Sequence, residues 1–343
     1  MRIGYPCVNI GIGCTSARTF RLRSWSPERF RSTVRENLAC LSSTLQFNID
    51  HGLLFFRITS DLIPFASHPV NEIDWEGEFS GNFTEIGDLI RESGMRISMH
   101  PDQFTLINSP DGGVTARSIA ELAYHAAVLD AMDLDARAKI QVHAGGVYGD
   151  KISAMDRFLD RYRDLPAAIR RRLVVENDDR LYTAADCCAL NRSCGVPVLF
   201  DTFHHECNSS GEEMPEALAI CAETWGRSDG IPMVDYSSQE PGARKGAHTH
   251  AIDLAHFRAF LAVSRPHDID IMLEIKDKEK SALLARAEAA ADPRLARVSG
   301  RAMPEHDKVI GRRRRRSMHR SPRPRRQCRG RERIVLICSG TGK

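Results

Sequence analysis

Five separate apolar runs in this chain end on a histidine or an acidic residue. Each run is short and almost continuously hydrophobic, which is typical of a strand buried on both faces of a parallel sheet. The closing residues are His100, His143, Glu176, Asp201 and Glu274. In a closed parallel barrel all strand ends converge on one rim, so these side chains would meet in a single pocket. Imidazoles and carboxylates gathered in one pocket predict a metal site.

Three further side chains of the same kinds lie at or just beyond predicted strand ends. Asp235 follows the apolar run 231–234, His204 lies in the segment DTFHH, and His248 lies in the loop segment GAHTH. One zinc ion takes about three or four protein ligands, so eight candidates predict two or three divalent ions that share a bridging carboxylate. A single histidine at a strand end is commonly structural. Several unpaired carboxylates around one mouth would be costly, however, unless cations lay between them.

A regular alternation of elements must position these residues. Ser26 and Pro27 form a helix start, and apolar residues then recur at steps of three and four up to Leu45. Comparable helical patterns cover residues 86–94, 119–132, 155–162, 183–190, 214–221, 254–261 and 278–290. Strand-like runs cover residues 2–5, 53–59, 96–100, 139–143, 172–176, 196–201, 231–234 and 270–274. Eight strands that alternate with eight helices predict an α/β fold, a (β/α)8 TIM barrel.

The charge of the chain is divided unevenly. Residues 312–333 carry twelve arginines and one glutamate, and with Lys343 they contribute +12, whereas the whole chain carries +3. Residues 1–311 therefore carry −9, and bound divalent ions would offset part of that charge. Helical periodicity stops near Ala290. We therefore predict a barrel domain over residues 1–300 and a disordered, Arg-rich tail over 301–343, which either grips phosphates or is dispensable.

Composition bounds the class of protein. Hydrophobic residues make up 42% of the chain, which is enough for a large core, and no apolar run approaches the roughly 18 residues of a membrane span. The N-terminus is strand-like rather than a signal peptide, so a soluble protein of the cytoplasm is expected. The ten cysteines include no Cys-x-x-Cys pair. We therefore expect reduced cysteines and no structural disulfide.

Nine segments, in order, resemble the UV damage endonuclease family. They lie within residues 4–279 and are spaced as in that family. The segments are 4–9 (GYPCVN), 18–23 (RTFRLR), 57–68 (RITSDLIPFASH), 100–104 (HPDQF), 142–146 (VHAGG), 176–179 (ENDD), 201–205 (DTFHH), 236–239 (YSSQ) and 272–279 (MLEIKDKE). The resemblance implies a TIM barrel that cuts double-stranded, UV-damaged DNA immediately 5′ of cyclobutane dimers and 6-4 photoproducts. Cutting would leave a 3′-hydroxyl and a 5′-phosphate.

The resemblance also implies roles for individual residues. Up to three divalent ions, commonly Mn²⁺ with Mg²⁺, Zn²⁺ or Co²⁺ as alternatives, would be held by eight ligands. One ion would lie on His100, His143 and Glu176. Glu176 would bridge to a second ion held with Asp201, Asp235 and Glu274, and His204 with His248 would hold a third. Glu176, His143 and His68 would be catalytic, His68 by orienting the site. The protein would act as a monomer without a membrane, on nucleoid DNA in a prokaryote.

Four further residues would contact DNA according to the same resemblance. Tyr5 and Asn9 would face the cleft, and Gln103 and Phe104 would enter the duplex beside the lesion. Two covalently joined pyrimidines stack poorly, so the damaged step is easier to open than intact DNA. Gln103 could offer a donor and an acceptor to the orphaned bases, while Phe104 could fill the vacated stacking space.

Two positions depart from the family pattern. Met233 stands where many members carry a modified lysine, and Asp235 stands where they carry histidine. Aspartate is the harder ligand and favours manganese or magnesium over zinc. Other readings remain open at this stage: a related barrel metalloenzyme, such as an apurinic-site endonuclease or a sugar isomerase, needs a similar rim. A non-catalytic protein that binds DNA through its tail would bind with strong salt dependence.

Overall fold

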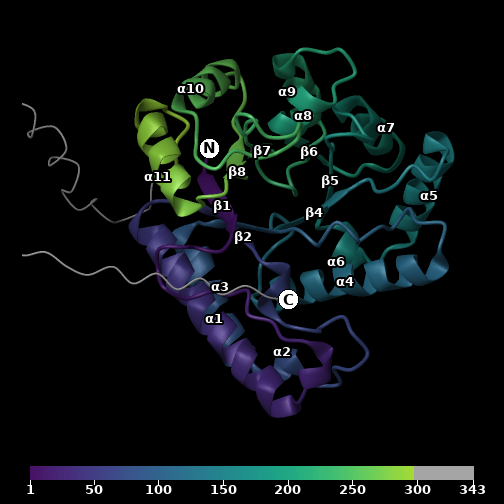
Figure 1. Ribbon diagram of the computed structural model, residues 1–343, viewed down its shortest axis with the longest axis vertical. Coiled ribbons are helices and arrows are strands. Elements are labelled where there is room, and N and C mark those ends of the chain that lie inside the picture. The colour runs from purple at the N-terminus through teal and green to yellow at the C-terminus, as the bar shows by residue number, and fades with distance from the viewer. Residues whose placement is uncertain (297–343) are drawn as a thin grey trace, which may run out of the picture. The chain divides into compact units, whose positions relative to one another are not determined.

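The structure, a computed structural model, describes residues 1–296, and the predicted tail lies outside the described residues. Eight parallel strands form a closed barrel in which each strand pairs with the next and β1 pairs with β8 (Figure 1). The strands are β1 Ile3–Cys7, β2 Phe55–Ile58, β3 Arg96–Met99, β4 Lys139–His143, β5 Leu173–Glu176, β6 Val198–Asp201, β7 Met233–Tyr236 and β8 Asp270–Leu273. The predicted TIM barrel is confirmed.

Helices follow the strands and surround the barrel. All eight predicted helices are present: α1 Pro27–Asp50, α3 Ser80–Ser93, α4 Gly112–Ala131, α5 Lys151–Asp164, α7 Ala184–Cys194, α9 Met214–Glu223, α10 Leu254–Val263 and α11 Glu279–Glu288. As predicted, Ser26 caps α1, where its hydroxyl accepts a hydrogen bond from the Arg29 amide at 3.2 Å. The short elements are α2 Trp75–Glu78, α6 Ala167–Arg170, α8 Thr202–Cys207 and the 3₁₀ turns Leu22–Ser24, Ser60–Leu62 and Ala289–Ala291.

A small apolar layer fills the middle of the barrel, apart from the larger core between strands and helices. Its members are Phe55, Val174, Leu199, Met233 and Met272. Each lies two residues before a polar residue of the same chain segment, and side chains two positions apart on a strand point the same way. The apolar layer therefore supports a polar layer made by Arg57, Glu176, Asp201, Asp235 and Glu274.

Strand β7 begins later than the sequence pattern predicts. The run 231–234 was expected to end before Asp235, whereas Asp235 lies inside Met233–Tyr236 and pairs in register with Asp201. Pro232 lacks an amide hydrogen and cannot donate to the ladder, which is a physical reason for the later start. Asp235 keeps its place beside Asp201.

The expectation of no disulfide is wrong: Cys14 and Cys40 are bonded, and the six other described cysteines are free. The loop after β1 folds back onto α1, which brings together two cysteines that lie 26 positions apart. Asn37, one turn before Cys40, holds the same loop through the backbone of Arg18. The spacing of the cysteines along the chain does not predict this disulfide, because the path of a long loop brings the two residues together.

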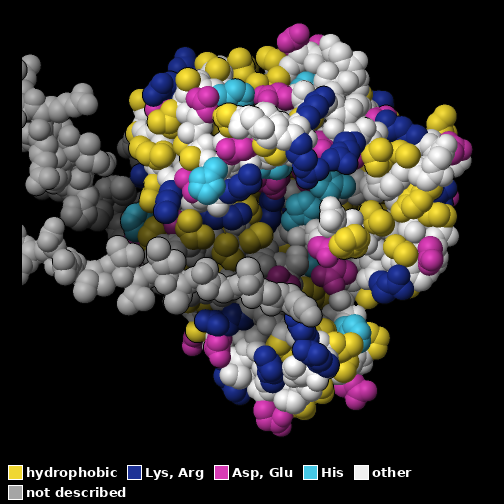
Figure 2. All heavy atoms as spheres, viewed as in Figure 1, with side chains coloured by type: hydrophobic (Ala, Val, Ile, Leu, Met, Phe, Trp, Pro, Cys, Tyr) yellow, Lys and Arg dark blue, Asp and Glu magenta, His cyan; other side chains and the backbone are white. Residues whose placement is uncertain are grey.

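The surface and the helices agree with a compact, charged barrel body. On the face drawn in Figure 2, Lys and Arg side chains are interspersed with Asp and Glu rather than gathered into one broad basic area. Within residues 1–296, no helix combines the length and the hydropathy that a bilayer crossing requires.

Candidate metal centre

Three linked groups of ligand atoms lie at the carboxyl ends of the strands. Within each group one ligand atom from every residue lies within 4.8 Å of the others. The groups are His100, His143 and Glu176; then Glu176, Asp201 and His204; then Asp201, Asp235 and Glu274. Glu176 and Asp201 each belong to two groups. The structure thus brings seven of the eight predicted ligands together, with two carboxylates in bridging positions.

Strand register explains most of this convergence. His143 lies opposite Glu176 between β4 and β5, and Asp201 lies opposite Asp235 between β6 and β7. His204 comes from the first turn of α8, which Asp201 caps by accepting a hydrogen bond from the His204 amide at 2.7 Å. This cap places the imidazole Nδ1 of His204 3.3 Å from Glu176 Oε1 and 3.6 Å from Asp201 Oδ2. Residues of two adjacent elements therefore meet through one capping bond.

Among residues 1–296, several buried polar atoms of the ligand groups have no hydrogen-bond partner. They are Asp201 Oδ2, His100 Nδ1 and His143 Nδ1. A buried acceptor without a donor costs about 1–3 kcal/mol, so unsatisfied atoms in one place call for an explanation. All three belong to residues of the linked groups. A divalent ion is a partner suited to imidazole nitrogen and carboxylate oxygen, so the residues fit the metal that the pattern predicts.

Electrostatics at the centre favour a cation. Burial opposes a charged imidazole at His204, but Asp201 and Glu176 outweigh it and raise the pKa of His204 to about 11. Burial, together with the charges of Glu176 and Glu274, raises the pKa of Asp201 to about 6. Without an ion, Asp201 thus retains its proton to a higher pH than a free aspartate does. A bound cation would displace that proton.

Sequence reasoning missed two residues of this centre, Arg57 and Gln141. Gln141 Nε2 donates to Glu176 Oε2 and to Asp235 Oδ2, both at 2.8 Å. Arg57 Nη2 donates to Asp235 at 2.6 Å, and Arg57 Nη1 donates to Glu274. A signal was present, because a polar residue inside an otherwise apolar, fully buried strand needs a partner within the barrel. The identity of the partner could not be read from the sequence.

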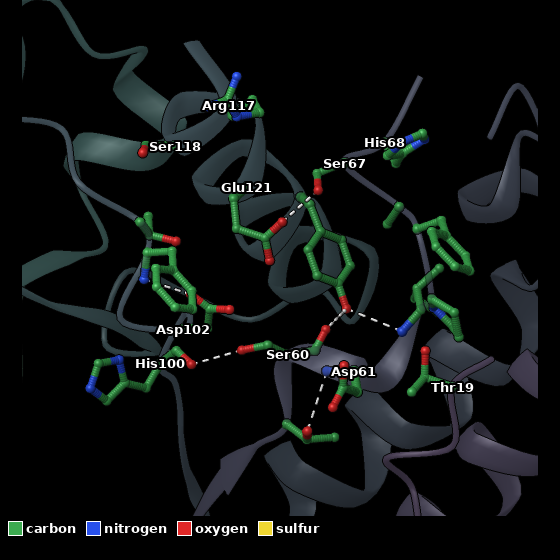
Figure 3. Close-up of a pocket in the computed structure, with 18 of the residues that line it drawn as sticks. Thr19, Ser60, Asp61, Ser67, His68, His100, Asp102, Arg117, Ser118 and Glu121 are labelled. Atoms are coloured by element: carbon green, nitrogen blue, oxygen red, sulfur yellow. Dashed lines mark hydrogen bonds between the residues drawn. The ribbon is translucent and has the colours of Figure 1, made fainter. Parts of the chain in front are cut away.

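Two predicted histidines lie outside the three groups. His248 points its Nδ1 toward the Glu274 carbonyl oxygen at 3.0 Å, and its ring lies 5.8 Å from the ring of His204. His68 is exposed on the loop after β2, where its Nδ1 accepts a hydrogen bond from the Val70 amide. It lines a cavity of about 820 Å³, which also reaches His100 and Phe104. In Figure 3 the labelled His68 and His100 lie on opposite sides of this cavity. Their roles at the metal stay predictions.

The comparisons with known proteins agree with this geometry. Residues 1–305 match the family described as UV-endonuclease UvdE. The chain belongs to this family. Members of the family that resemble it include two proteins named UV DNA damage endonuclease. The one from Clostridium perfringens (strain 13 / Type A) is 36% identical over 82% of this chain and 69% of that protein. The one from Bacillus cereus (strain Q1) is 35% identical over 82% of this chain and 92% of that protein.

This UvdE family member is also similar to a solved structure. The crystal structure of SacUVDE has a TM-score of 0.81 and 42% identity, and the match covers 84% of this chain and 98% of that one. The family is one of endonucleases, and membership in it implies DNA as the substrate.

The predicted DNA-contacting residues of this UvdE family member fall into two classes. Gln103 and Phe104 are exposed on the loop after β3, and the Phe104 side chain is 72% exposed. An aromatic ring so exposed beside the centre is available to a ligand. Tyr5 and Asn9 are buried instead: Asn9 Nδ2 donates to the Tyr5 hydroxyl at 2.8 Å, and Tyr5 donates to Asn48 Oδ1 at 2.7 Å. Both residues stabilise the turn after β1, and DNA contact by either stays a prediction.

Proposed function

We propose that this protein is a metal-dependent DNA-repair endonuclease that nicks the strand immediately 5′ of UV photoproducts, both cyclobutane dimers and 6-4 photoproducts. The products would be a 3′-hydroxyl and a 5′-phosphate. The observation that carries the proposal is the chain of three linked ligand groups at the barrel mouth, beside the exposed Phe104. The substrate is double-stranded DNA in the cytoplasm, on the nucleoid in a prokaryote, and the protein acts as a monomer.

The ligand groups suit phosphodiester hydrolysis. Their residues would hold two or three divalent ions, with Glu176 and Asp201 as shared ligands. Such ions polarise a phosphate, yield hydroxide near neutral pH and stabilise the departing oxygen. Gln141 orients Glu176 through its 2.8 Å hydrogen bond, so that the carboxylate faces both neighbouring groups. The four carboxylates favour Mn²⁺ or Mg²⁺ over Zn²⁺ and Co²⁺, because oxygen ligands suit harder ions.

Lesion recognition falls to the loop after β3. Asp102 accepts a hydrogen bond from the Phe104 amide at 2.6 Å, which fixes the turn that presents Gln103 and Phe104 to solvent. A ring presented in this way can replace a base in the stack of a weakened step. Gln103 can donate to and accept from the bases that lose their partners. Selectivity then follows from the lower cost of opening DNA at a photoproduct.

Two sets of variants test the proposal. We expect His143→Ala and Glu176→Ala to lower nicking of an irradiated plasmid by at least about 100-fold while damaged-DNA binding persists, because they remove ligands and not contacts to the bases. Gln103→Ala with Phe104→Ala should instead lose the preference for irradiated over intact DNA, by roughly 10-fold.

Controls separate the proposal from its rivals. An intact plasmid and an apurinic plasmid are assayed beside the irradiated one, and product ends are mapped on a duplex with a single dimer. Preferential nicking of the apurinic plasmid would instead indicate an apurinic-site endonuclease. If the protein binds ions but nicks none of the three DNA substrates, the proposed endonuclease activity is contradicted.

A further inference from the structure

The polar layer of the barrel contains a cation of its own. Arg57 is only 2% exposed and extends from β2 across the mouth toward β7 and β8. Its Nη2 lies 2.8 Å from Asp235 Oδ1 and 2.6 Å from Asp235 Oδ2, and its Nη1 binds Glu274 Oε1. Asp235 and Glu274 are two of the three members of one ligand group. A guanidinium therefore lies where that group would receive an ion.

The three ligand groups differ in how open they are. Within the described residues, His100, His143 and Asp201 each have a buried nitrogen or oxygen atom without a hydrogen-bond partner. Asp201 also belongs to the third group, but the two other members of that group are paired with Arg57. In the third group both oxygens of Asp235 accept hydrogen bonds from Arg57, and Oδ2 accepts a further one from Gln141 at 2.8 Å. Each oxygen of Asp235 thus accepts at least one N–H donor, and the carboxyl group is fully engaged. An ion there would have to displace the guanidinium.

Among the described residues, the layer beneath the third group does not compensate for such a displacement. The side chain of Met233, two residues before Asp235, belongs to the apolar layer together with Met272. That layer offers carbon and sulfur but no further charged oxygen to a hard ion. A displaced Arg57 would also have to leave a site in which it is almost completely buried and doubly paired, which is costly for a charged group.

The net charge of the centre also favours two divalent ions over three. Four carboxylates and one guanidinium leave a formal charge of −3 when the imidazoles are neutral. Two divalent ions and one bound anion, hydroxide or phosphate, balance that charge. A third ion would leave an excess of positive charge in a buried site, which is unfavourable without further anionic ligands.

We propose that Arg57 is a resident cation that takes the place of a third ion and limits the centre to two divalent ions, at His100, His143 and Glu176 and at Glu176, Asp201 and His204. Arg57 is a positioning residue: it holds Asp235 and Glu274 beside the ions without contacting the reacting atoms. The inference rests on the metal centre of the proposed function and is independent of which DNA is cut.

The test counts ions per chain. The full-length protein is stripped with chelator, equilibrated with Mn²⁺, separated from free ion and analysed for manganese, with titration calorimetry as a second count. Wild type should bind two ions. Arg57→Gln should bind a third, because Asp235 and Glu274 are released, whereas Arg57→Lys keeps the positive charge and should stay at two.

Each outcome decides the inference. Three ions in the wild type would overturn the inference even if no variant folds. An unchanged ion count in a folded Arg57→Gln protein would also overturn it, and circular dichroism monitors folding.

Nicking of the irradiated plasmid is assayed on the same samples. Two bound ions without nicking would contradict the proposed function and leave this inference standing. Nicking with three bound ions would support the proposed function and contradict this inference. No bound manganese would contradict both.

Discussion

Asp201 shows how much a single residue does in this centre. One oxygen caps α8 and accepts the amide of His204, while the other has no hydrogen-bond partner among the described residues. The residue belongs to two ligand groups. Because the side chain is fully buried, burial and the charges of Glu176 and Glu274 oppose its ionisation in the metal-free protein and outweigh the favourable effect of His204. Metal binding and fold stability are therefore linked at this carboxylate.

Asp201→Asn should stabilise the metal-free protein at high pH. Burial and neighbouring carboxylates raise the pKa of Asp201 to about 6, above its unfolded value. The protonated carboxyl thus stabilises the fold below about pH 4, and this contribution is lost as the pH rises through about 6. Asparagine does not titrate. In thermal unfolding without metal, the variant should match wild type near pH 4 and exceed it at pH 8 by roughly 1–3 kcal/mol.

Manganese provides the control for this prediction. At pH 8 saturating Mn²⁺ should reverse the order of the two melting temperatures, because the ionised Asp201 binds the ion and asparagine binds it poorly. A metal-free wild type as stable at pH 8 as the variant would show that the carboxylate is not under electrostatic strain.

At the scale of elements, α1 supports the mouth from outside the barrel. Asn37 is fully buried on α1 and connects two loops. Its Oδ1 accepts the Arg18 amide at 2.9 Å, and its Nδ2 donates to the carbonyl oxygens of Arg18, Asp61 and Leu62. The loops after β1 and β2 are thereby fixed to one helix, with the Cys14–Cys40 disulfide close by. One amide side chain thus orders two loops at the end of the barrel that carries the metal centre.

Asn37→Ala should lower the free energy of unfolding by roughly 2–4 kcal/mol, since buried backbone groups lose their partners. Ser43→Ala is a matched control on the same helix: Ser43 is exposed and bonds only to the carbonyl of Ala39, so its loss should be near zero. Urea denaturation measures both. Equal effects of the two substitutions would mean that the loops are held by other contacts.

The molecule as a whole separates its charges along the chain. Residues 1–311 carry −9 and residues 312–343 carry +12. The acidic part contains the metal centre, where ions would offset the charge of the carboxylates. Affinity for intact DNA therefore has to come from local basic side chains or from the twelve arginines of residues 312–333. These twelve arginines lie outside the described residues, and their contribution has to be measured.

Truncation after Gly311 should keep lesion-dependent nicking and weaken binding to intact DNA by at least about 10-fold at low salt. The slope of log affinity against log salt concentration should also become shallower, because fewer counterions are released. A full-length variant with glutamines in place of the arginines at 312–316 controls for chain length. Loss of nicking upon truncation would mean that residues 312–343 are required for catalysis, which would contradict this prediction.

The sequence by itself determined the barrel, because hydrophobic period, helix caps and strand-end polar residues are local features of the chain. It also determined seven of the side chains that gather at the mouth, since parallel strands bring all their carboxyl ends to one rim. Only the tertiary structure decided the partners. Arg57 reaches Asp235 across the barrel, Gln141 reaches Glu176, and Cys14 reaches Cys40. These contacts depend on strand register and loop path through space, which no spacing along the chain encodes.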